Sequence, residues 1–541
     1  MYLPKIFIKE TLFSYWEIIC ITVLGTFLRF YHIGVKSLWV DEAFSFRSAQ
    51  LPLSQIWGAQ ALVEPNPPLY YTLLKLWILF FGESEAALRS LSTVIGILTI
   101  PLIYVLGRSL GNQQLGLIAA LLLAISPINI QYSQEARGYT LLTLAVTLVI
   151  LGLVGLLSDP EGSKMPIGQA FIQNLFSKPS SDSRNRAKLT TDLAWLVYIL
   201  GLSLAFYAHS TAVFLPVISS INIFIFWMRN LRFNKTFFWN WIIANTLILV
   251  IWAWWLTFML RQTHLNSWIP FTTIRDAVDI LKGVWIETVQ EPERILRACK
   301  YFLFLSLALL GLWRWRNNIN KLTLINTFLV GFPLLVFIVS LYRPLFIPRV
   351  FLWTTIPLYL LLASGILAFR SRFLTILIVT VFFIFQLKSI NNYYCQPSIE
   401  PWNQVANHVL SRVKKEDVIL FYSSGVGSTI LFNYYSPRNF SEIVHYHLVP
   451  NYLGTKYFLE FENTRALSIA DISSTISAVR RVWLVGRYNF KVSSDKDEFL
   501  TKTLNALNQK MKQTTYINYG YNLNIFLFDN IKESTSTERL K

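Results

Sequence analysis

The 541-residue sequence is poor in charge and in cysteine. Charged residues make up 14% of it, whereas soluble domains carry about 25%. The three cysteines, Cys20, Cys299 and Cys395, lie far apart, and their spacing fits neither a disulfide framework nor a metal site. No internal repeat and no inverted pair of broken apolar segments of the transporter kind is present. These absences argue against a soluble, disulfide-stabilised or repeat protein.

Apolar residues are abundant instead, at 54% of the chain, with 15% aromatic. A membrane-spanning helix needs roughly 20 mostly apolar residues, and such runs recur from Leu12 to Ile390. The first run, Leu12–Tyr31, has no small-residue cleavage site after it, which indicates a retained helix rather than a signal peptide. The pattern predicts an α-helical polytopic membrane protein with about eleven spans.

The formal net charge of +18 comes from Lys and Arg in short loops between apolar runs. The positive-inside rule explains this distribution better than nucleic-acid binding does, and it predicts a cytoplasmic amino terminus. The inner loops would be 107–113, 158–191, 229–235, 314–321 and 370–372. The outer loops would be 32–85, 131–139, 207–210, 261–300 and 342–349.

The apolar run Pro67–Phe81 is short and is followed by an acidic stretch, so we interpret it as an interfacial or re-entrant helix in the first outer loop. The next true span would be Ala86–Leu106. The composition changes after residue 390, which divides the chain into a transmembrane domain, 1–390, and a small extracytoplasmic α/β domain, 391–541. Its predicted strands are 418–422, 482–485 and 523–528, and its predicted helices are 402–414 and 496–512.

Two carboxylates, Asp41 and Glu42, follow the first span closely enough to stay near the membrane surface. At a helix start they could simply satisfy the helix amino terminus. Alternatively, a carboxylate there can accept a proton from an incoming hydroxyl or amine. The residues alone leave both interpretations open.

Further polar groups lie at the ends of predicted outer helices. Glu135 stands between two apolar helices, where it could pair with Arg137 or cap the next helix. If Glu135 and Asp41 face one outer cavity instead, they could bind a divalent metal or orient a polar acceptor. Pro67 and Pro68 are explained by backbone geometry and leave Glu64 and Asn66 as polar groups beside them. The arginines of these loops either snorkel to the interface or bind a phosphate. Carboxylates and arginines around one outward cavity would suit group transfer from a lipid-linked phosphate to a polar acceptor.

The order of these motifs resembles the family-39-like membrane glycosyltransferases of the GT-C superfamily, which include dolichyl-phosphate-mannose protein mannosyltransferases and the bacterial aminoarabinose transferase. The resemblance covers roughly residues 10–370 and rests on the following segments in order: Asp41-Glu42, Pro67–Tyr71, Glu85–Arg89, Ser133–Tyr139, His209 and Pro348-Arg349. It implies a GT-C fold and an inverting glycosyltransferase with a polyprenyl-phosphate-linked sugar donor, acting on the outer face of a bacterial plasma membrane.

The resemblance also implies roles for individual residues. Asp41 would be the catalytic base and Glu42 its neighbour. The donor phosphate or lipid would be bound by a set of basic residues, namely Arg349, Arg343, Arg89 and Lys75. The acceptor or cavity would involve Glu64, Asn66, Tyr70, Glu135, Arg137, Tyr139 and His209. Many relatives have His where this chain has Asn66, which weakens a metal-binding role for that position.

The expected partners are a polyprenyl-phosphate-linked sugar, membrane lipid and a protein, lipid or glycan acceptor, and no nucleic acid. No cofactor is required by this interpretation, although a divalent metal is left open. Two other functions compete with it. One is a transporter or flippase of lipid-linked sugars, and the other is a non-catalytic membrane scaffold whose carboxy-terminal domain binds partners.

Overall fold

A computed structural model describes the chain over residues 5–58, 64–157, 183–230, 235–261, 269–286, 293–398, 400–422, 427–436, 444–448, 466–476, 479–487, 498–519 and 523–531. The chain divides into two compact units. One, which we call the helical unit, comprises residues 1–33, 64–82 and 87–396. The other, the sheet unit, comprises residues 34–63, 83–86 and 397–541. Each unit is described by itself.

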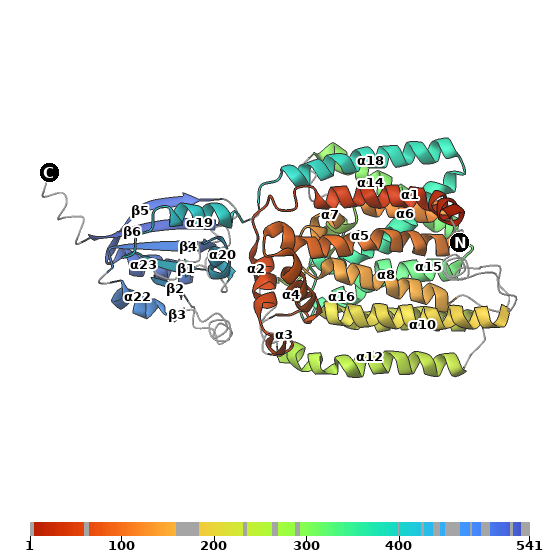
Figure 1. Cartoon of the computed structure of the whole chain (residues 1–541), viewed down its shortest axis with the longest axis horizontal. Coiled ribbons are helices and arrows are strands. Elements are labelled where there is room, and N and C mark those ends of the chain that lie inside the picture. Colours follow the sequence, from red (N-terminus) through yellow and green to blue (C-terminus); the bar gives the residue numbers. More distant parts are fainter. Residues whose placement is uncertain are drawn as a thin grey trace. The chain divides into compact units, whose positions relative to one another are not determined.

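The helical unit consists of long helices that run roughly parallel to one another (Figure 1). Its α-helices are α1 (Lys5–Phe30), α4 (Leu69–Phe81), α5 (Glu85–Leu110), α6 (Gln113–Ala124), α7 (Pro127–Ser133), α8 (Tyr139–Leu156), α10 (Ser183–Ala208), α11 (Leu215–Asn230), α12 (Lys235–Arg261), α13 (Ile274–Trp285), α14 (Arg294–Trp315), α15 (Ile319–Asn326), α16 (Phe332–Ser340), α17 (Thr355–Ile366) and α18 (Arg372–Cys395). Short helical turns extend or join them: η2 (Ser210–Phe214), η3 (Thr327–Gly331), η4 (Pro348–Thr354) and η5 (Leu367–Phe369).

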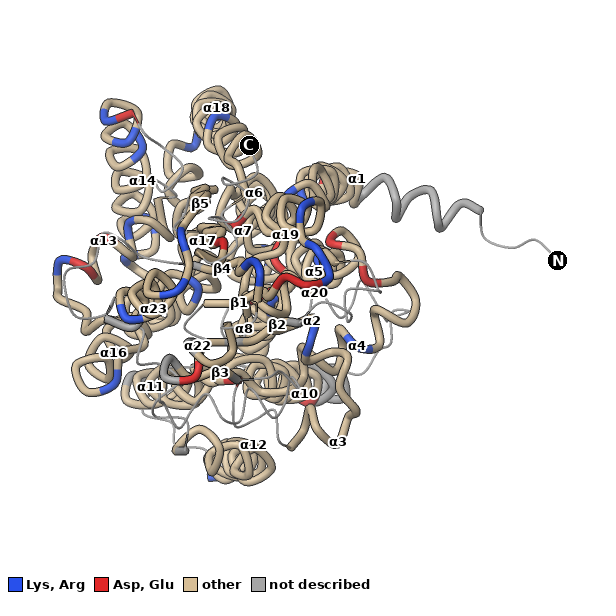
Figure 2. The backbone as a smooth tube through the Cα atoms, turned by 90° about the vertical axis from the view of Figure 1, so that its left-hand side faces the viewer, with Lys and Arg blue, Asp and Glu red and all other residues tan. Residues whose placement is uncertain are grey.

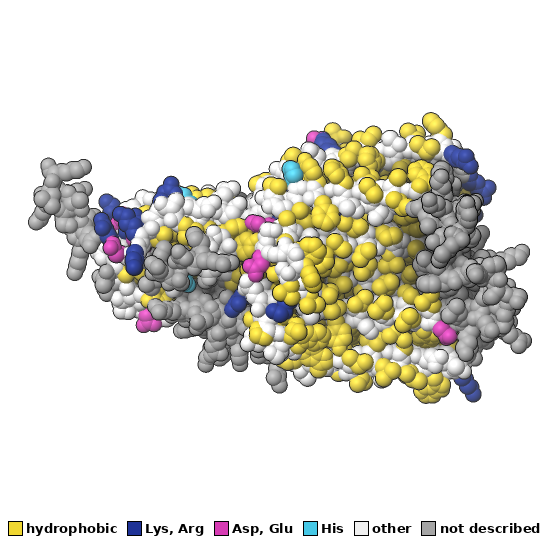
Figure 3. All heavy atoms as spheres, viewed as in Figure 1, with side chains coloured by type: hydrophobic (Ala, Val, Ile, Leu, Met, Phe, Trp, Pro, Cys, Tyr) yellow, Lys and Arg dark blue, Asp and Glu magenta, His cyan; other side chains and the backbone are white. Residues whose placement is uncertain are grey.

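Within the described residues, nine helical segments are long and apolar enough to cross a membrane. A tenth is obtained if α6 and α7, which meet at a bend of 61°, count as one broken span. Hydrophobic side chains cover most of the visible face of these helices, and few residues along them are charged (Figures 2 and 3). The protein is therefore an integral membrane protein, as its composition predicts.

Close helix packing in this unit depends on glycine where α14 crosses α17. A Cβ atom built on Gly365 would lie 1.9 Å from the carbonyl oxygen of Leu307, and one built on Gly311 would lie 2.3 Å from that of Leu361. Small residues at such positions let two helix backbones approach, which is how membrane helices associate in the absence of a strong hydrophobic effect. Nearly all of the α17 span is buried inside the protein.

The sheet unit has a six-stranded sheet with the order β3-β2-β1-β4-β6-β5. Its strands are β1 (Val418–Tyr422), β2 (Val444–Leu448), β3 (Ala466–Leu467), β4 (Arg481–Arg487), β5 (Met511–Asn518) and β6 (Leu523–Asn530). The first four pair in parallel, whereas β6 pairs antiparallel with both β4 and β5. The helices of this unit are α2 (Val40–Gln50), α3 (Leu53–Ile56), α19 (Trp402–Leu410), α20 (Gly427–Tyr435), α22 (Ile469–Thr475) and α23 (Glu498–Asn508).

Several details differ from the sequence-based expectations, among them the predicted helix 402–414, which ends at Leu410, and the predicted inner loop 158–191, in which α10 begins at Ser183. The predicted outer loop 261–300 contains a helix, α13, whose first turn is capped by Thr273 and Asp276. The predicted helix 496–512 ends at Asn508, and its last predicted residues belong to strand β5, which begins at Met511. Most of the predicted inner loop 158–191 lies outside the described residues.

Candidate functional site

The predicted site residues fall into both units. Asp41 and Glu42 belong to the sheet unit. The remaining predicted site residues belong to the helical unit: Glu64, Asn66, Tyr70, Lys75, Arg89, Glu135, Arg137, Tyr139, His209, Arg343 and Arg349.

A buried ion pair joins two of the motifs in the helical unit. Arg137 Nη2 lies 3.2 Å from Glu64 Oε1, and both side chains are less than one tenth exposed. The backbone N–H and the Nδ2 amide of Asn66 also donate to Glu64 Oε1, at 3.2 and 3.0 Å. A carboxylate in a dry interior needs such partners to stay ionised. The ion pair of Arg137 is therefore with Glu64 and spans two segments distant in sequence.

The helix starts on either side of this pair are tied together by hydroxyl groups. Pro68 is the residue before α4, which places Tyr70 in its first turn. The Tyr70 hydroxyl lies 2.7 Å from Ser92 Oγ, which in turn donates to the carbonyl oxygen of Arg137 at 3.0 Å. These bonds fix the turn that carries Arg137 against the start of α4.

Tyr139, the first residue of α8, contacts two guanidinium groups. The ring centre is 5.9 Å from the Cζ atom of Arg137 and also 5.9 Å from that of Arg349. His209 contacts the same ring at a centroid distance of 6.2 Å. We call Glu64, Arg137, Tyr139, His209 and Arg349 the Arg–Tyr cluster. It brings together residues from separate parts of the sequence.

His209 is held as a neutral imidazole in this cluster. Burial lowers the pKa of His209 to about 3, and the positive charges of Arg349 and Arg137 act in the same direction. Its Nδ1 atom accepts from the backbone N–H of Thr211 at 3.2 Å. The five members of the cluster thus include two guanidinium groups, the carboxylate of Glu64 and a neutral histidine.

The other predicted phosphate ligands are engaged elsewhere. Arg89 donates to the carbonyl oxygen of Ile33 at 2.9 Å, and Arg343 donates to that of Met259 at 3.4 Å. Lys75 is half-buried on α4. Of the four basic residues predicted to bind the donor, Arg349 is the one in the Arg–Tyr cluster.

In the sheet unit, the acidic pair occupies the first turn of α2. Glu42 is fully buried, and its Oε2 atom accepts from the backbone N–H of Trp39 at 3.3 Å. Asp41 is half-buried. The capping role thus belongs to Glu42, and Asp41 is the less buried residue of the pair.

Glu135, the second acidic residue considered for a metal, accepts from Gln131 Nε2 at 3.4 Å. Among the residues that the structure describes, no three His, Cys, Asp or Glu side chains gather in an arrangement that could hold a metal ion. The Arg–Tyr cluster, with one carboxylate already paired to Arg137, is not a cation site.

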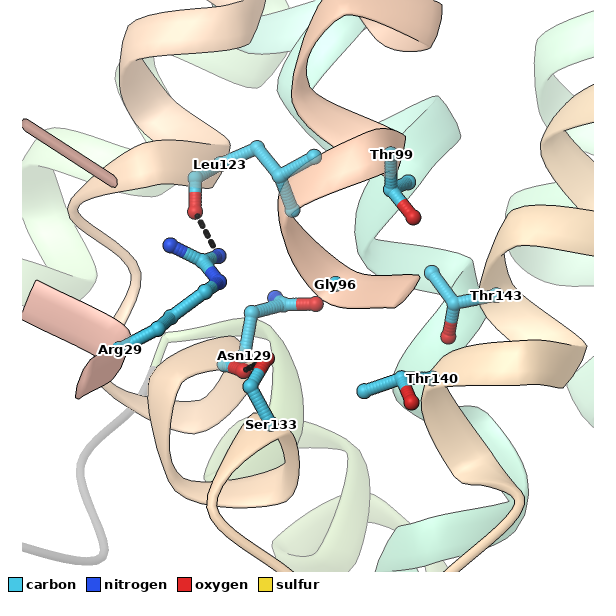
Figure 4. A pocket seen from close by; sticks show the side chains of 8 residues that line it. All are labelled: Arg29, Gly96, Thr99, Leu123, Asn129, Ser133, Thr140 and Thr143. Atoms are coloured by element: carbon cyan, nitrogen blue, oxygen red, sulfur yellow. Dashed lines mark hydrogen bonds between the residues drawn. The ribbon is translucent and has the colours of Figure 1, made fainter. Parts of the chain in front are cut away.

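Sequence reasoning missed a polar pocket inside the helical unit (Figure 4). Arg29 is buried there and donates to the carbonyl oxygens of Leu123 and Ala124, each at 3.0 Å. Its Nε atom and the Thr140 hydroxyl have no hydrogen-bond partner within the described part of the chain. The pocket is lined by Arg29, Gly96, Thr99, Leu123, Asn129, Ser133, Thr140 and Thr143. An arginine at the end of an apolar run is expected to snorkel to the interface, so no sequence signal points to this pocket.

The fold defines an integral membrane protein, and it is similar to solved structures with the GT-C fold. The structure of ArnT from Cupriavidus metallidurans in the apo state has a TM-score of 0.60 to this chain, at 8% identity over 94% of this chain and 97% of that one. ArnT bound to undecaprenyl phosphate gives a TM-score of 0.59 at 10% identity, over 95% and 98%. The apo oligosaccharyltransferase of Archaeoglobus fulgidus gives 0.51 at 10% identity, over 87% and 69%.

Sequence comparison gives a narrower match. Residues 65–171 match the family described as dolichyl-phosphate-mannose-protein mannosyltransferase. An uncharacterised protein of Aquifex aeolicus (strain VF5) is 26% identical over 181 residues, a match that covers 28% of this chain and 36% of that protein. The matched part thus spans about a third of that relative. These matches confirm the fold class and the resemblance to GT-C glycosyltransferases that the motif order predicts.

The Glu64–Arg137 pair should be strongly coupled. Glu64→Leu and Arg137→Met should each lower the free energy of unfolding by about 3 kcal/mol, because each leaves a buried charge without its partner. The double variant should lose less than the sum of the two. Unfolding of the purified protein in detergent measures all three. The exposed pair of Lys282 and Asp279 is the control, and Asp279→Asn should change stability by less than about 0.5 kcal/mol. Additive losses at Glu64 and Arg137 would contradict the coupling.

The neutral state of His209 predicts a pH dependence of stability. Its pKa is depressed from 6.5 to about 3 on folding, so between these values the unfolded chain binds the extra proton. Stability is therefore fully present above pH 6.5 and falls as the pH drops, with a loss from this residue of about 2 kcal/mol at pH 5. In detergent, the melting temperature should fall less between about pH 7 and pH 5 for His209→Gln than for the wild type. Parallel pH curves would rule out a buried neutral His209.

Proposed function

We propose that this protein is an inverting glycosyltransferase that moves a monosaccharide from a polyprenyl-phosphate donor to a protein, lipid or glycan acceptor at the outer membrane face. The observation that carries this proposal is the Arg–Tyr cluster in a GT-C fold. The guanidinium of Arg349, at the beginning of η4, suits recognition of a lipid-linked phosphate. The similarity to ArnT, one structure of which contains undecaprenyl phosphate, supports the same chemistry.

In the proposed reaction, Asp41 accepts the proton of the acceptor hydroxyl or amine. The acceptor atom then attacks the anomeric carbon, and the bond between that carbon and the phosphate oxygen breaks. The polyprenyl phosphate leaves with the electron pair, and its charge is neutralised by Arg349. A single in-line displacement inverts the sugar and needs one base. The assignment of Asp41 rests on its motif and on its lower burial, since Glu42 is fully buried and accepts from the backbone at the helix start.

The distribution of basic loops supports an outer site with the amino terminus in the cytoplasm, where the positive-inside rule places Lys and Arg. The sheet unit would then be extracytoplasmic, in the periplasm if the membrane is a bacterial inner membrane. The competing transporter hypothesis predicts a different outcome, because a flippase moves the donor across the membrane and leaves its glycosidic bond intact.

The test is release of polyprenyl phosphate from a panel of undecaprenyl-phosphate sugars by the full-length protein in lipid nanodiscs. Asp41→Asn should lower release by a factor of about 10²–10⁴, the usual contribution of a general base. Glu42→Gln, which keeps an oxygen to accept from Trp39, should retain release within about tenfold of the wild type. Both variants must melt like the wild type. An Asp41→Asn variant with full activity would exclude this residue as the base.

The same preparations distinguish the alternatives. If the wild type moves a labelled donor across vesicle membranes without cleaving it, the protein is a flippase. If it neither cleaves nor moves any donor of the panel, the proposed function is wrong.

A further inference from the structure

Four consecutive backbone N–H groups lead into α2 inside the sheet unit, and each donates to a side chain. Ser37 N donates to Ser398 Oγ at 3.0 Å, and Leu38 N donates to the Tyr435 hydroxyl at 2.8 Å. The next two bonds involve carboxylates. Trp39 N donates to Glu42 Oε2, and Val40 N donates to Glu400 Oε2, each at 3.3 Å. Three of these four acceptors come from the chain beyond residue 397, between 360 and 397 residues away in sequence.

The acceptors are themselves held in place. Glu400 is 1% exposed, and its Oε2 atom also accepts from Trp402 Nε1 at 3.1 Å. The Tyr435 hydroxyl receives a second bond, from Ser37 Oγ at 3.1 Å. A buried carboxylate bound to a fully buried indole has little freedom to move. Glu400 therefore holds the amide of Val40 in a fixed position.

Side-chain packing reinforces these bonds. A Cβ atom built on Gly427, the first residue of α20, would lie 2.6 Å from Val40 Cγ1, so the start of α2 is packed directly against the start of α20. Farther along α2, the Phe46 ring stacks edge-on against Tyr434 at 5.2 Å. Hydrogen bonds and packing contacts thus hold the segment that immediately precedes Asp41.

A helix start normally leaves its first N–H groups to solvent or to a local cap. Here the local cap is Glu42, which accepts from Trp39, and the amide of Val40, the first residue of α2, is satisfied by Glu400 of the sheet unit's later segment. Such an arrangement determines the position and direction of α2, and hence of the Asp41 side chain one residue after Val40. A general base must be placed to within a fraction of an ångström, because a misplacement of about 1 Å can cost 10²-fold in rate.

We infer that Glu400 and Tyr435 are positioning residues for the base, and that the carboxy-terminal segment acts in the transfer reaction by holding Asp41 in its reactive position. This rests on the proposed function of Asp41. It assigns to the segment 397–541 a part in turnover, in place of a purely stabilising or scaffolding one.

The test compares Glu400→Ala with a matched control, Asp417→Ala, in the full-length protein. Asp417 is also a buried carboxylate of the sheet unit, 1% exposed, and accepts from Trp483 Nε1 at 3.0 Å. It also accepts from Arg481 and from the backbone of Lys414, and none of these partners belongs to the segment 37–40. Both variants should lose thermal stability to a similar extent.

Glu400→Ala should lower kcat for polyprenyl-phosphate release at least about tenfold while changing KM for the donor less than about twofold. Asp417→Ala should leave kcat within about twofold of the wild type. Glu400→Gln, whose amide oxygen can still accept from Val40, should restore most of kcat, and Tyr435→Phe should lower it. Equal losses of kcat in Glu400→Ala and Asp417→Ala, or no loss in either, would overturn the inference and leave the proposed function standing.

Hydrogen exchange tests the positioning without any activity. Amides in a peptide covering residues 36–44 should exchange at least about tenfold faster in Glu400→Ala than in Asp417→Ala. Unchanged exchange in Glu400→Ala would overturn the inference even if the wild type released no polyprenyl phosphate, an outcome that would separately refute the proposed function.

Discussion

A charge buried among membrane helices must have a partner, and the Glu64–Arg137 ion pair meets this requirement in the helical unit. The pair ties the proline-rich segment before α4 to the turn before α8. The second cation of the cluster, Arg349, contacts the same Tyr139 ring as Arg137 does. Burial also keeps His209 neutral. The cluster therefore brings two guanidinium groups to one tyrosine ring, and a guanidinium is suited to recognition of a phosphate.

In the sheet unit, hydrogen bonds hold the start of α2, which carries Asp41 and Glu42. Its two acidic residues have separate roles, because Glu42 is buried and caps α2 whereas Asp41 is half-buried. Hydrogen bonds to Glu400 and Tyr435 extend this support to the preceding backbone. The segment beyond residue 397 thereby becomes part of the proposed catalytic apparatus, although no motif in it points to a function.

Much of this organisation could be predicted because it depends on local patterns. Apolar runs of span length predicted the membrane helices, and short apolar runs such as 418–422 predicted strands. The partner of Arg137 could not be predicted, because Glu64 lies 73 residues away and only the folded chain brings them together. The hydrogen bonds that Tyr435 and Glu400 accept at the start of α2 could not be predicted either, because these residues also lie far from α2 in the sequence. Helix α13 was missed because a short, amphipathic helix looks like a polar loop when long spans are sought.

The central claim is that the helical unit recognises a polyprenyl chain through its phosphate. Native mass spectrometry of the full-length protein, released from detergent with equal amounts of undecaprenyl phosphate and undecaprenol, tests it directly. We predict one bound undecaprenyl phosphate per chain and a preference of at least about tenfold over undecaprenol, as a charge-assisted contact to the phosphate would give. Equal retention of the two lipids, or retention of neither, would contradict it.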